Sequence, residues 1–223
     1  MRKIILLGLI GLGAVSLYAQ EQTLPVSLGF KVGLPVTDMF SASNTTAFGN
    51  TTPGPYTSAV PWYVFGVTGE FHVYKNIRFE VDGLFRRGGF DTALPYANTG
   101  LLAYYPTTFD QWEIPGLFKT DVKLGRFRPF IDFGAALRHI SDISQTVYAP
   151  GVLIPPINDN AQELHNRNSF GGVAGFGFTF KEGPVKLSPE ARYTRWANES
   201  FMSTVPGLRT NLDQGEVLLG ITF

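Results

Sequence analysis

The last ten residues of the chain, from Gln214 to Phe223, alternate strictly between two kinds of side chain. Val217, Leu219, Ile221 and Phe223 fall on one face of an extended strand, and mostly small or polar residues fall on the other. A period of two predicts a β-strand with one apolar face. The alternation continues to the final aromatic residue, so the strand has no polar tail. We expect its apolar face to lie against an apolar phase.

Seven further segments alternate in the same way, so the sequence predicts eight strands. Each is about 10–13 residues long, which suits a tilted strand that crosses the hydrocarbon core of a membrane. Bulky apolar residues dominate one face, whereas Gly, Ser, Thr and charged residues dominate the other. The predicted strands are Val26–Val36, Trp62–Tyr74, Ile77–Arg87, Gln111–Lys123, Arg128–Ile140, Asn168–Phe180, Val185–Arg195 and Gln214–Phe223.

The connections between the predicted strands alternate between short and long. Tight turns are expected around Lys75-Asn76, from Leu124 to Phe127, and at Glu182-Gly183. The long connections are rich in Gly, Pro, Asn, Ser and Thr, which predicts loops. With an even number of strands, both chain ends lie on the side of the short turns. The predicted loops are Thr37–Pro61, Gly88–Asp110, Ser141–Arg167 and Trp196–Asp213.

The faces of neighbouring strands must match across each tight turn, which predicts the turn geometry. A two-residue loop at Glu182-Gly183 places Lys181 opposite Pro184 and keeps inward residues together. At Lys75-Asn76 the faces match only if the turn ends in a bulge with Asn76 left-handed. We expect that bulge.

Prolines and tryptophans at strand positions carry further expectations. Pro115 and Pro189 lack a backbone donor inside strands of a closed barrel, so each predicts a bulge, a kink or an unused ladder position. Trp62, Trp112 and Trp196 lie near the long-loop ends of their strands. An aromatic girdle at the membrane interface explains them best, and a ligand-stacking platform is the alternative.

The first 19 residues have the pattern of an export signal. Arg2 and Lys3 supply positive charge, Ile4–Leu17 is apolar, and Leu17-Tyr18-Ala19 offers a cleavage site before Gln20. The apolar run is too short to predict a transmembrane helix. The chain has no Cys, which excludes disulfides, thiol chemistry and a lipoprotein anchor. We expect one mature domain, residues 20–223.

Composition separates the classes of function that remain. The sequence holds 19 Phe, 9 Tyr and 3 Trp, and only 16% of its residues are charged. That charged share is below the usual value for a soluble domain. The formal net charge is zero, which gives no support to nucleic-acid binding.

The interior of an eight-stranded barrel decides which face of the strands points outward. This interior is just wide enough for side chains to fill. Bulky Phe, Tyr and Leu from eight strands would crowd it, whereas Gly, Ala, Ser, Thr and paired charges fit. We therefore predict an all-β fold, an eight-stranded antiparallel up-and-down transmembrane β-barrel with its apolar face against lipid.

The inward face then carries acidic and basic residues that nearly balance. Buried charges must be paired, and the expected register places Glu113 opposite Arg138 and Lys119 opposite Asp132. Such a network predicts a plugged lumen, and an ion-selective pore is the alternative. The predicted lumen network consists of Lys31, Glu70, Arg78, Glu80, Asp82, Arg86, Glu113, Lys119, Asp121, Asp132, Arg138, Glu190, Arg192 and Glu216.

Three short segments add to this pattern: Glu113-Ile114-Pro115, Arg192-Tyr193 and Leu219-Gly220-Ile221-Thr222-Phe223. With the export signal, they make residues 25–223 resemble the small outer-membrane β-barrel family, of the OmpA/OmpX-type size class. The resemblance implies an integral protein of the bacterial outer membrane, surrounded by lipid and lipopolysaccharide. It also implies insertion by the barrel-assembly machinery, which recognises a closing strand such as the one that ends at Phe223.

One constellation is a candidate for catalysis. His139 and Ser141 lie two residues apart on the outward face, and outer-membrane lipid A deacylases use a His-x-Ser arrangement that faces lipid. The pair would need an orienting acid, for which Asp142 or Asp110 is the candidate. A polar strand end at the headgroup level explains the same residues without chemistry. His72 and His165 have no second ligand nearby in sequence, so we expect no metal site and no cofactor.

The third predicted loop contains an unusually apolar run, Ala149–Ile157. Exposed apolar segments often mark interaction sites, although this run would equally suit a lid over the barrel mouth. We therefore predict a non-enzymatic protein with a structural or surface-interaction role through long extracellular loops. The alternatives are a narrow porin-like diffusion channel and a lipid A-modifying hydrolase.

Overall fold

The computed structural model describes residues 26–42, 45–47, 50–52, 56–58, 63–96, 101–125, 127–149, 152–158, 161, 163–202 and 208–223. The predicted export signal at residues 1–19 lies outside the described residues, as do Trp62, Pro150 and Gly151. In the described parts of the chain, no helix is both long and apolar enough to cross a membrane.

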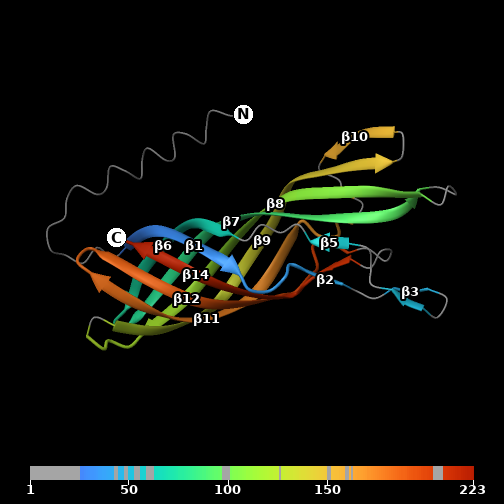
Figure 1. The fold of residues 1–223 in the computed structure, drawn as a ribbon. Coiled ribbons are helices and arrows are strands. Elements are labelled where there is room, and N and C mark those ends of the chain that lie inside the picture. Colours follow the sequence, from blue (N-terminus) through green and yellow to red (C-terminus); the bar gives the residue numbers. More distant parts are fainter. Residues whose placement is uncertain are drawn as a thin grey trace.

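Eight antiparallel strands close into a barrel (Figure 1), which confirms the predicted fold. The first and last strands pair with each other, from Gly29 opposite Thr222 to Pro35 opposite Glu216. Each other strand pairs with its neighbours in chain order, as an up-and-down barrel requires. In order around the barrel, the strands are β1 (Val26–Pro35), β6 (Val64–Tyr74), β7 (Ile77–Tyr96), β8 (Leu101–Asp121), β9 (Phe127–Ala149), β11 (Asn168–Glu182), β12 (Val185–Trp196) and β14 (Asp213–Thr222).

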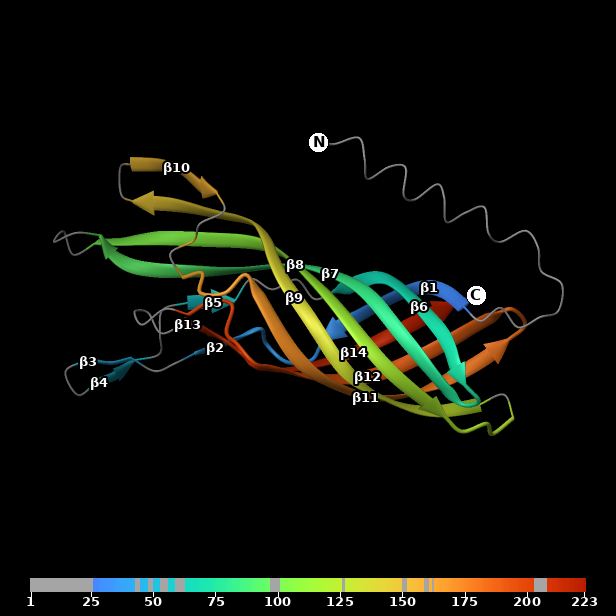
Figure 2. The same ribbon diagram turned by 180° about the vertical axis from the view of Figure 1, so that it is seen from behind.

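Three neighbouring strands continue far beyond the end of the barrel (Figures 1 and 2). Strands β7, β8 and β9 have 20, 21 and 23 residues, whereas β1 and β14 have 10 each. Two short strands extend this wall at its edges, because β5 (Tyr56–Ser58) pairs with β7 and β10 (Val152–Asn158) pairs with β9. We call these five strands, beyond Arg87 and Asp110, the extension sheet.

The extension sheet corrects two predicted loops. Most of Gly88–Asp110, and Ser141–Arg167 up to Asn158, forms paired strands instead. The β7–β8 ladder runs without a register shift from Arg87 opposite Asp110 to Tyr96 opposite Leu101. Thr, Tyr and Phe in these segments favour strands, and continued pairing overrides the Gly and Pro residues that suggested loops.

The other two long connections also contain short strands. The first holds β2 (Phe40–Ala42), β3 (Thr45–Ala47) and β4 (Asn50–Thr52), and the last holds β13 (Leu208–Thr210). Strand β2 pairs with β13, and β3 pairs with β4. The β2–β13 pair ties the first connection to the last at the long-loop end of the barrel.

The tight turns keep the predicted faces but differ in detail. A register shift between His72 and Tyr74 confirms the bulge, but the left-handed residue is Lys75, with φ of 40°, and not Asn76. At the last turn Glu182 lies opposite Val185, so the loop residues are Gly183 and Pro184. The predicted pairing of Lys181 with Pro184 is therefore wrong by two residues, which leaves the inward faces unchanged. Gly183 takes the left-handed conformation that the turn needs, with φ of 61°.

Neither proline inside a strand produces a register shift. The β7–β8 ladder lapses between Val81–Gly116 and Leu84–Glu113, beside Pro115, and resumes in the same register. The β11–β12 ladder lapses beside Pro189 in the same way. A local gap in pairing therefore accommodates each missing donor, so of the three predicted alternatives the unused ladder position is the one found at Pro115 and Pro189.

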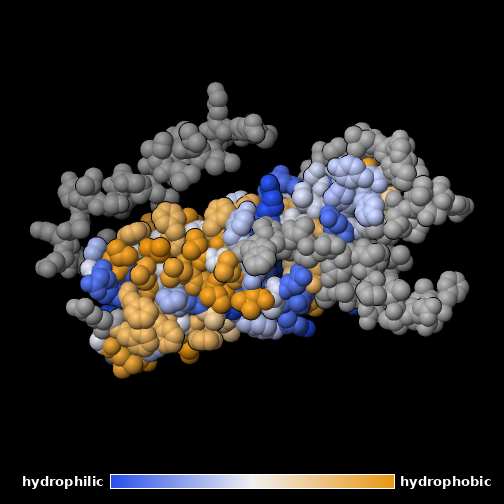
Figure 3. Space-filling view, viewed as in Figure 1, coloured by the Kyte–Doolittle hydropathy of each residue, from blue (hydrophilic) through white to orange (hydrophobic). Residues whose placement is uncertain are grey.

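The outward face of the barrel is apolar and the inward face is buried. Exposed Leu, Val, Ile and Phe side chains occur on all eight barrel strands, with Phe30 and Phe176 each 60% exposed, and Figure 3 shows them covering most of the barrel wall on one face. The predicted orientation of the strands is therefore confirmed. The extension sheet lies beyond this band, at the end of the molecule where hydrophilic residues cover the surface.

Candidate functional site in the lumen and at its long-loop end

Every charged residue predicted to line the lumen is buried, with an exposed fraction of 6% or less. The strands bring them together because inward positions recur every second residue on all eight. These residues are Lys31, Glu70, Arg78, Glu80, Asp82, Arg86, Glu113, Lys119, Asp121, Asp132, Arg138, Glu190, Arg192 and Glu216.

A cluster at mid-height joins strands from opposite sides of the barrel. Lys31 Nζ on β1 lies 3.0 Å from Asp82 on β7 and 3.0 Å from Glu190 on β12, and it also pairs with Glu80. The Arg192 guanidinium donates to Glu190 at 2.6 Å and to Asp82 at 2.9 Å. Two cations therefore share three carboxylates across the lumen.

Two smaller groups lie on either side of this cluster. Toward the short turns, Arg78 pairs with Glu70 and Asp121, each at 2.9 Å. Toward the long loops, Arg86 pairs with Glu113 at 2.7 Å and with Glu216. Since these pairs are buried, removal of one partner would leave an uncompensated buried charge, which costs several kcal/mol.

Two pairs of lumen charges lie in the predicted register, but their members do not form ion pairs with each other. Lys119 lies opposite Asp132 and Glu113 lies opposite Arg138. Lys119 bends away, however, and pairs with Glu70 at 3.2 Å and with Glu80. Among the described residues, neither carboxylate oxygen of Asp132 has a hydrogen-bond partner, and no guanidinium nitrogen of Arg138 has one. The prediction that both pairs form is therefore wrong, because register sets backbone neighbours and not side-chain direction.

The Arg138 guanidinium stacks on the ring of Trp196. The Trp196 ring lies in the lumen, 1% exposed, and the Arg138 guanidinium carbon stacks 4.2 Å from its centroid. Its indole nitrogen donates to Gln214 Oε1 at 2.5 Å. The predicted girdle position is wrong for Trp196, although Trp112 is 46% exposed on the outward face. The strand ends at Trp196, one residue beyond the predicted end at Arg195. The inward alternation of Arg192 and Thr194 then continues to Trp196, and this alternation could have predicted its place in the lumen.

Above the lumen, a second buried cluster fills the space between the extension sheet and the connections, and we call it the cap core. Phe201 packs against Phe109 and Phe90, with ring centroids 4.6 and 5.3 Å apart, and Phe40 meets Phe90 edge to face at 5.3 Å. Sequence reasoning missed this cluster because its members come from four separate connections. Its members are Met39, Phe40, Phe90, Phe109, Ile140, Ile143, Ala161, Phe201 and Leu208.

The residues of the candidate hydrolase do not form a catalytic chain. His139 is exposed and its Nδ1 lies 2.7 Å from Asn168 Oδ1. Asp110 accepts a hydrogen bond from Arg87 Nε at 2.8 Å, so its carboxylate is already engaged. Asp142 is exposed with φ of 47°. Within the described part of the chain, Ser141 thus makes no hydrogen bond to an imidazole or an acid that would activate it.

No metal centre is evident in the described part of the chain. Within it, no group of three or more His, Asp or Glu side chains is arranged to hold a metal ion. His72 lies at a short turn and His165 at the long-loop end, and both are exposed.

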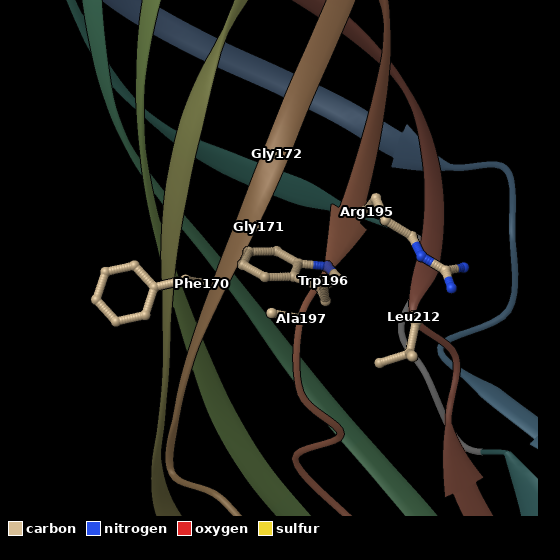
Figure 4. A pocket seen from close by; sticks show the side chains of 7 residues that line it. All are labelled: Phe170, Gly171, Gly172, Arg195, Trp196, Ala197 and Leu212. Atoms are coloured by element: carbon tan, nitrogen blue, oxygen red, sulfur yellow. The ribbon is translucent and has the colours of Figure 1, made fainter.

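An open pocket of about 470 Å³ lies at the long-loop rim of the barrel wall (Figure 4). Gly172 lies opposite Arg195 in the β11–β12 ladder, and the missing side chain creates the space. Arg195 and Tyr193 both bind the Asp213 carboxylate, so the nearest charges are already paired. The pocket is lined by Phe170, Gly171, Gly172, Arg195, Trp196, Ala197 and Leu212.

The sequence matches a known protein family over most of its length. Residues 18–196 match the family described as outer membrane protein beta-barrel domain. The chain belongs to this family. It is therefore an integral β-barrel protein of the bacterial outer membrane. Among curated protein sequences, none matches the chain.

Solved structures of outer-membrane proteins are similar to this family member. OprG from Pseudomonas aeruginosa is 13% identical, with 88% of this chain and 92% of that chain covered and a TM-score of 0.54. Neisserial surface protein A is 14% identical over 88% and 94% of the chains, with a TM-score of 0.47. Ail, the attachment invasion locus protein of Yersinia pestis, is 11% identical over 88% and 94%, with a TM-score of 0.32. At these identities, the likeness to OprG supports the barrel fold alone.

Membership of the outer-membrane barrel family also orients the molecule. In such barrels the short turns face the periplasm and the longer loops face the outside of the cell. The extension sheet and the cap core of this barrel are therefore extracellular, and the turns at Lys75 and Gly183 are periplasmic.

Proposed function

We propose that this protein is a non-enzymatic barrel that presents an ordered extracellular surface to partners of the cell. The cap core carries the proposal. Loops that only connected strands would need no shared apolar core, yet residues from four connections pack together beyond the membrane. Burial of several aromatic rings stabilises one arrangement of these segments. An ordered surface reduces the entropy lost when a partner binds.

The ion-paired lumen supports a presenting role over a conducting one. An eight-stranded barrel leaves little space after side chains fill it, and here the clusters around Lys31, Arg78 and Arg86 cross it at three levels. The Asn168 contact of His139 likewise favours a polar strand end over a hydrolase. Planar bilayer recordings of the refolded protein should show no large, steady conductance, and a stable open channel would favour the narrow diffusion channel instead.

Strand β10 is the candidate contact segment of this surface. It forms a hairpin with β9, from Val152 opposite Ala149 to Asn158 opposite Ser144, and it lies at the outer edge of the extension sheet, away from the barrel mouth (Figures 1 and 2). A segment in that place is better suited to contact with partners than to a role as a lid.

Deletion of residues 150–157 tests the proposed function. Cells that carry the shortened protein should lose adhesion to host cells or to other bacteria, while the barrel keeps its heat-modifiable migration on gels. Because β10 pairs with no described strand other than β9, at the edge of the sheet, its loss should leave the cap core folded. Undiminished adhesion, together with a folded barrel, would contradict a surface role for this segment.

Insertion by the barrel-assembly machinery remains part of the proposal. The last strand ends at Thr222, and the Phe223 side chain is 62% exposed on the lipid-facing side of the periplasmic rim. Replacement of Phe223 by Ser should reduce the amount of assembled barrel in the outer membrane without a change in synthesis.

A further inference from the structure

Two tyrosines form an exposed aromatic pair on the outer face of the extension sheet. Tyr104 on β8 and Tyr148 on β9 lie directly opposite each other in the antiparallel ladder. Their side chains are 54% and 52% exposed. Opposed residues of this kind have Cβ atoms about 5 Å apart on the same face of the sheet, so the two rings share one patch.

The patch lies well above the lipid band. Trp112 on the same strand is the outward aromatic residue at the long-loop end of the barrel, 46% exposed. Eight residues separate it from Tyr104, which corresponds to about 27 Å along a strand. At the tilt of barrel strands, about 40°, the height above the band is about 20 Å. Water and headgroups, not acyl chains, surround the rings at this height.

The same face is continuous with the lipid-facing wall. Strands β8 and β9 pass from the barrel into the extension sheet with one register shift, between Thr108 and Asp110. The outer face of the sheet therefore looks sideways, across the membrane surface, and not away from the cell. The material beside it is whatever extends upward from the neighbouring outer-leaflet lipids.

The chemistry of the face fits sugars better than phosphates. Thr108, Ser144 and Thr146 share the face with the two tyrosines, which offers hydroxyl donors and acceptors beside aromatic rings. An aromatic ring presents an apolar, electron-rich face and Tyr adds a polar tip, and the C–H faces of a sugar ring complement both. Phosphate binding would call for Arg or Lys, and Arg87, lower on the same wall, is already paired with Asp110.

We propose that the outer face of the extension sheet, through Tyr104 and Tyr148, binds the saccharide chains of glycolipids in the outer leaflet. The site borders the proposed contact segment, because Leu153 of β10 lies opposite Tyr148 in the ladder, but the side chains that define it come from β8 and β9. It gives the barrel a lateral ligand, which would hold the extension sheet upright among the surrounding glycolipids.

Tyrosine nitration in two reconstituted membranes tests the proposal on the unmodified protein. One membrane contains lipopolysaccharide with its core sugars, and the other contains lipid A, which has the same acyl chains and phosphates without core sugars. With core sugars present, the rate of nitration by tetranitromethane at Tyr104 and Tyr148 should fall about fivefold. Tyr74, 60% exposed at the periplasmic end, is the internal control and should react equally in both membranes.

Variants then separate recognition from crowding. Delipidated core oligosaccharide should give saturation-transfer NMR signals with the detergent-refolded protein, and the Tyr104→Ala/Tyr148→Ala double variant should lose them. Tyr104→Phe/Tyr148→Phe keeps the rings and should retain most of the signal, and Tyr74→Ala should retain all of it. Maltohexaose, a soluble sugar chain, should give a weaker signal than the core oligosaccharide.

Several results would overturn the proposal. Equal nitration of Tyr104 and Tyr148 in the two membranes would do so, as would a signal that the double Ala variant keeps. A stronger signal from maltohexaose would assign the patch to a soluble glycan instead. Heat-modifiable migration of each variant shows that the barrel is folded, and intact adhesion of the β10 deletion would leave this proposal standing while it removed the proposed surface role of β10.

Discussion

The lumen and the cap core are two interiors of one molecule, and they differ in composition: the lumen combines ion-paired charges with a few apolar side chains such as Leu84, whereas the cap core is an apolar, largely aromatic cluster. Along β7, the inward residues Glu80, Asp82 and Arg86 lie in the lumen. Four residues beyond Arg86, the inward residue is Phe90, which belongs to the cap core. The outward residues change in the reverse sense, from Phe79 and Phe85 to Asp91. The inversion falls between Arg86 and Phe90, where the strand leaves the lipid.

This difference shows that the surrounding solvent, and not the strand, decides what an interior is made of. Inside the lipid band, apolar side chains gain little by turning inward, and ion pairs cross the lumen between strands. Beyond the band, water restores the hydrophobic effect, and aromatic rings pack inward. The predictions below are ways to break or sharpen this contrast.

The largest effect is expected in the lumen, at Glu80. Its carboxylate contacts Lys31, Lys119 and Arg192, all buried. Glu80→Gln leaves these cations without a shared counter-charge and should lower the free energy of unfolding by about 3–5 kcal/mol. Urea unfolding in detergent, followed by tryptophan fluorescence, measures the loss. A change below 1 kcal/mol would mean that water already screens the lumen.

A smaller and more local effect is expected in the cap core, at Phe201. Its ring packs on Phe40, Phe90 and Phe109. Phe201→Ala should cost about 3 kcal/mol, but the cost is limited to opening of the cap. Hydrogen exchange should therefore speed up in the extension sheet while exchange in β12 and β14 stays slow. Uniform destabilisation of the barrel would show that the two interiors unfold together.

The Phe201→Ala variant also shows which of the two interiors blocks the passage of ions through the barrel. If the ion pairs close the lumen by themselves, the opened cap should still give no steady conductance in planar bilayers. A channel that appears only in this variant would place the barrier in the cap core instead.

A gain in stability is expected from Asp132, the carboxylate without a partner. Gly175 lies opposite it in the β9–β11 ladder and leaves the space that the carboxylate occupies. Asp132→Asn removes the buried charge and keeps a side chain of similar shape, so it should raise the free energy of unfolding by about 1 kcal/mol. Glu80→Gln is the matched control, because the same chemical change should have the opposite sign there. A loss of stability at Asp132 would show that it holds an unrecognised counter-ion.

The smallest effect is expected for an ion pair at the boundary between the two interiors. Arg87 pairs with Asp110 at 2.8 Å, but its side chain is 62% exposed. Arg87→Gln should change the free energy of unfolding by less than about 0.5 kcal/mol, and 1 M salt should remove even this difference. The lumen pairs should respond much less to salt, since they are buried. A large effect of Arg87→Gln would move the boundary of the lumen outward.

The sequence was sufficient for the barrel but not for the parts that depend on side-chain choice. Alternation predicts the strands and their number, and the narrow interior of an eight-stranded barrel predicts which face points outward. Alternation also places Lys119 opposite Asp132, yet Lys119 reaches Glu80 and leaves Asp132 unpaired. A long flexible side chain can choose among several partners at similar distance, and alternation carries no information on that choice.

The extension sheet was missed for a different reason. Gly, Pro and Thr between Gly88 and Asp110 are typical of loops when read locally. Their pairing depends on a partner strand at the far side of a hairpin, from Arg87–Asp110 to Tyr96–Leu101. The cap core was missed for the same reason, since Phe90 and Phe109 can face Phe201 only when β7 and β8 continue beyond the barrel.

The seam between β1 and β14 imposes an order on how the barrel can be completed. Lys31 comes from the first strand to leave the ribosome, and Glu216, which reaches Arg86 across the lumen, comes from the last. A chain that stops short of β14 presents Arg86 with one carboxylate fewer and leaves an unpaired strand edge toward lipid, both of which are costly. A chain that lacks β14 should therefore be less stable in the bilayer than the full chain, since it loses both this counter-charge and the closure of the barrel.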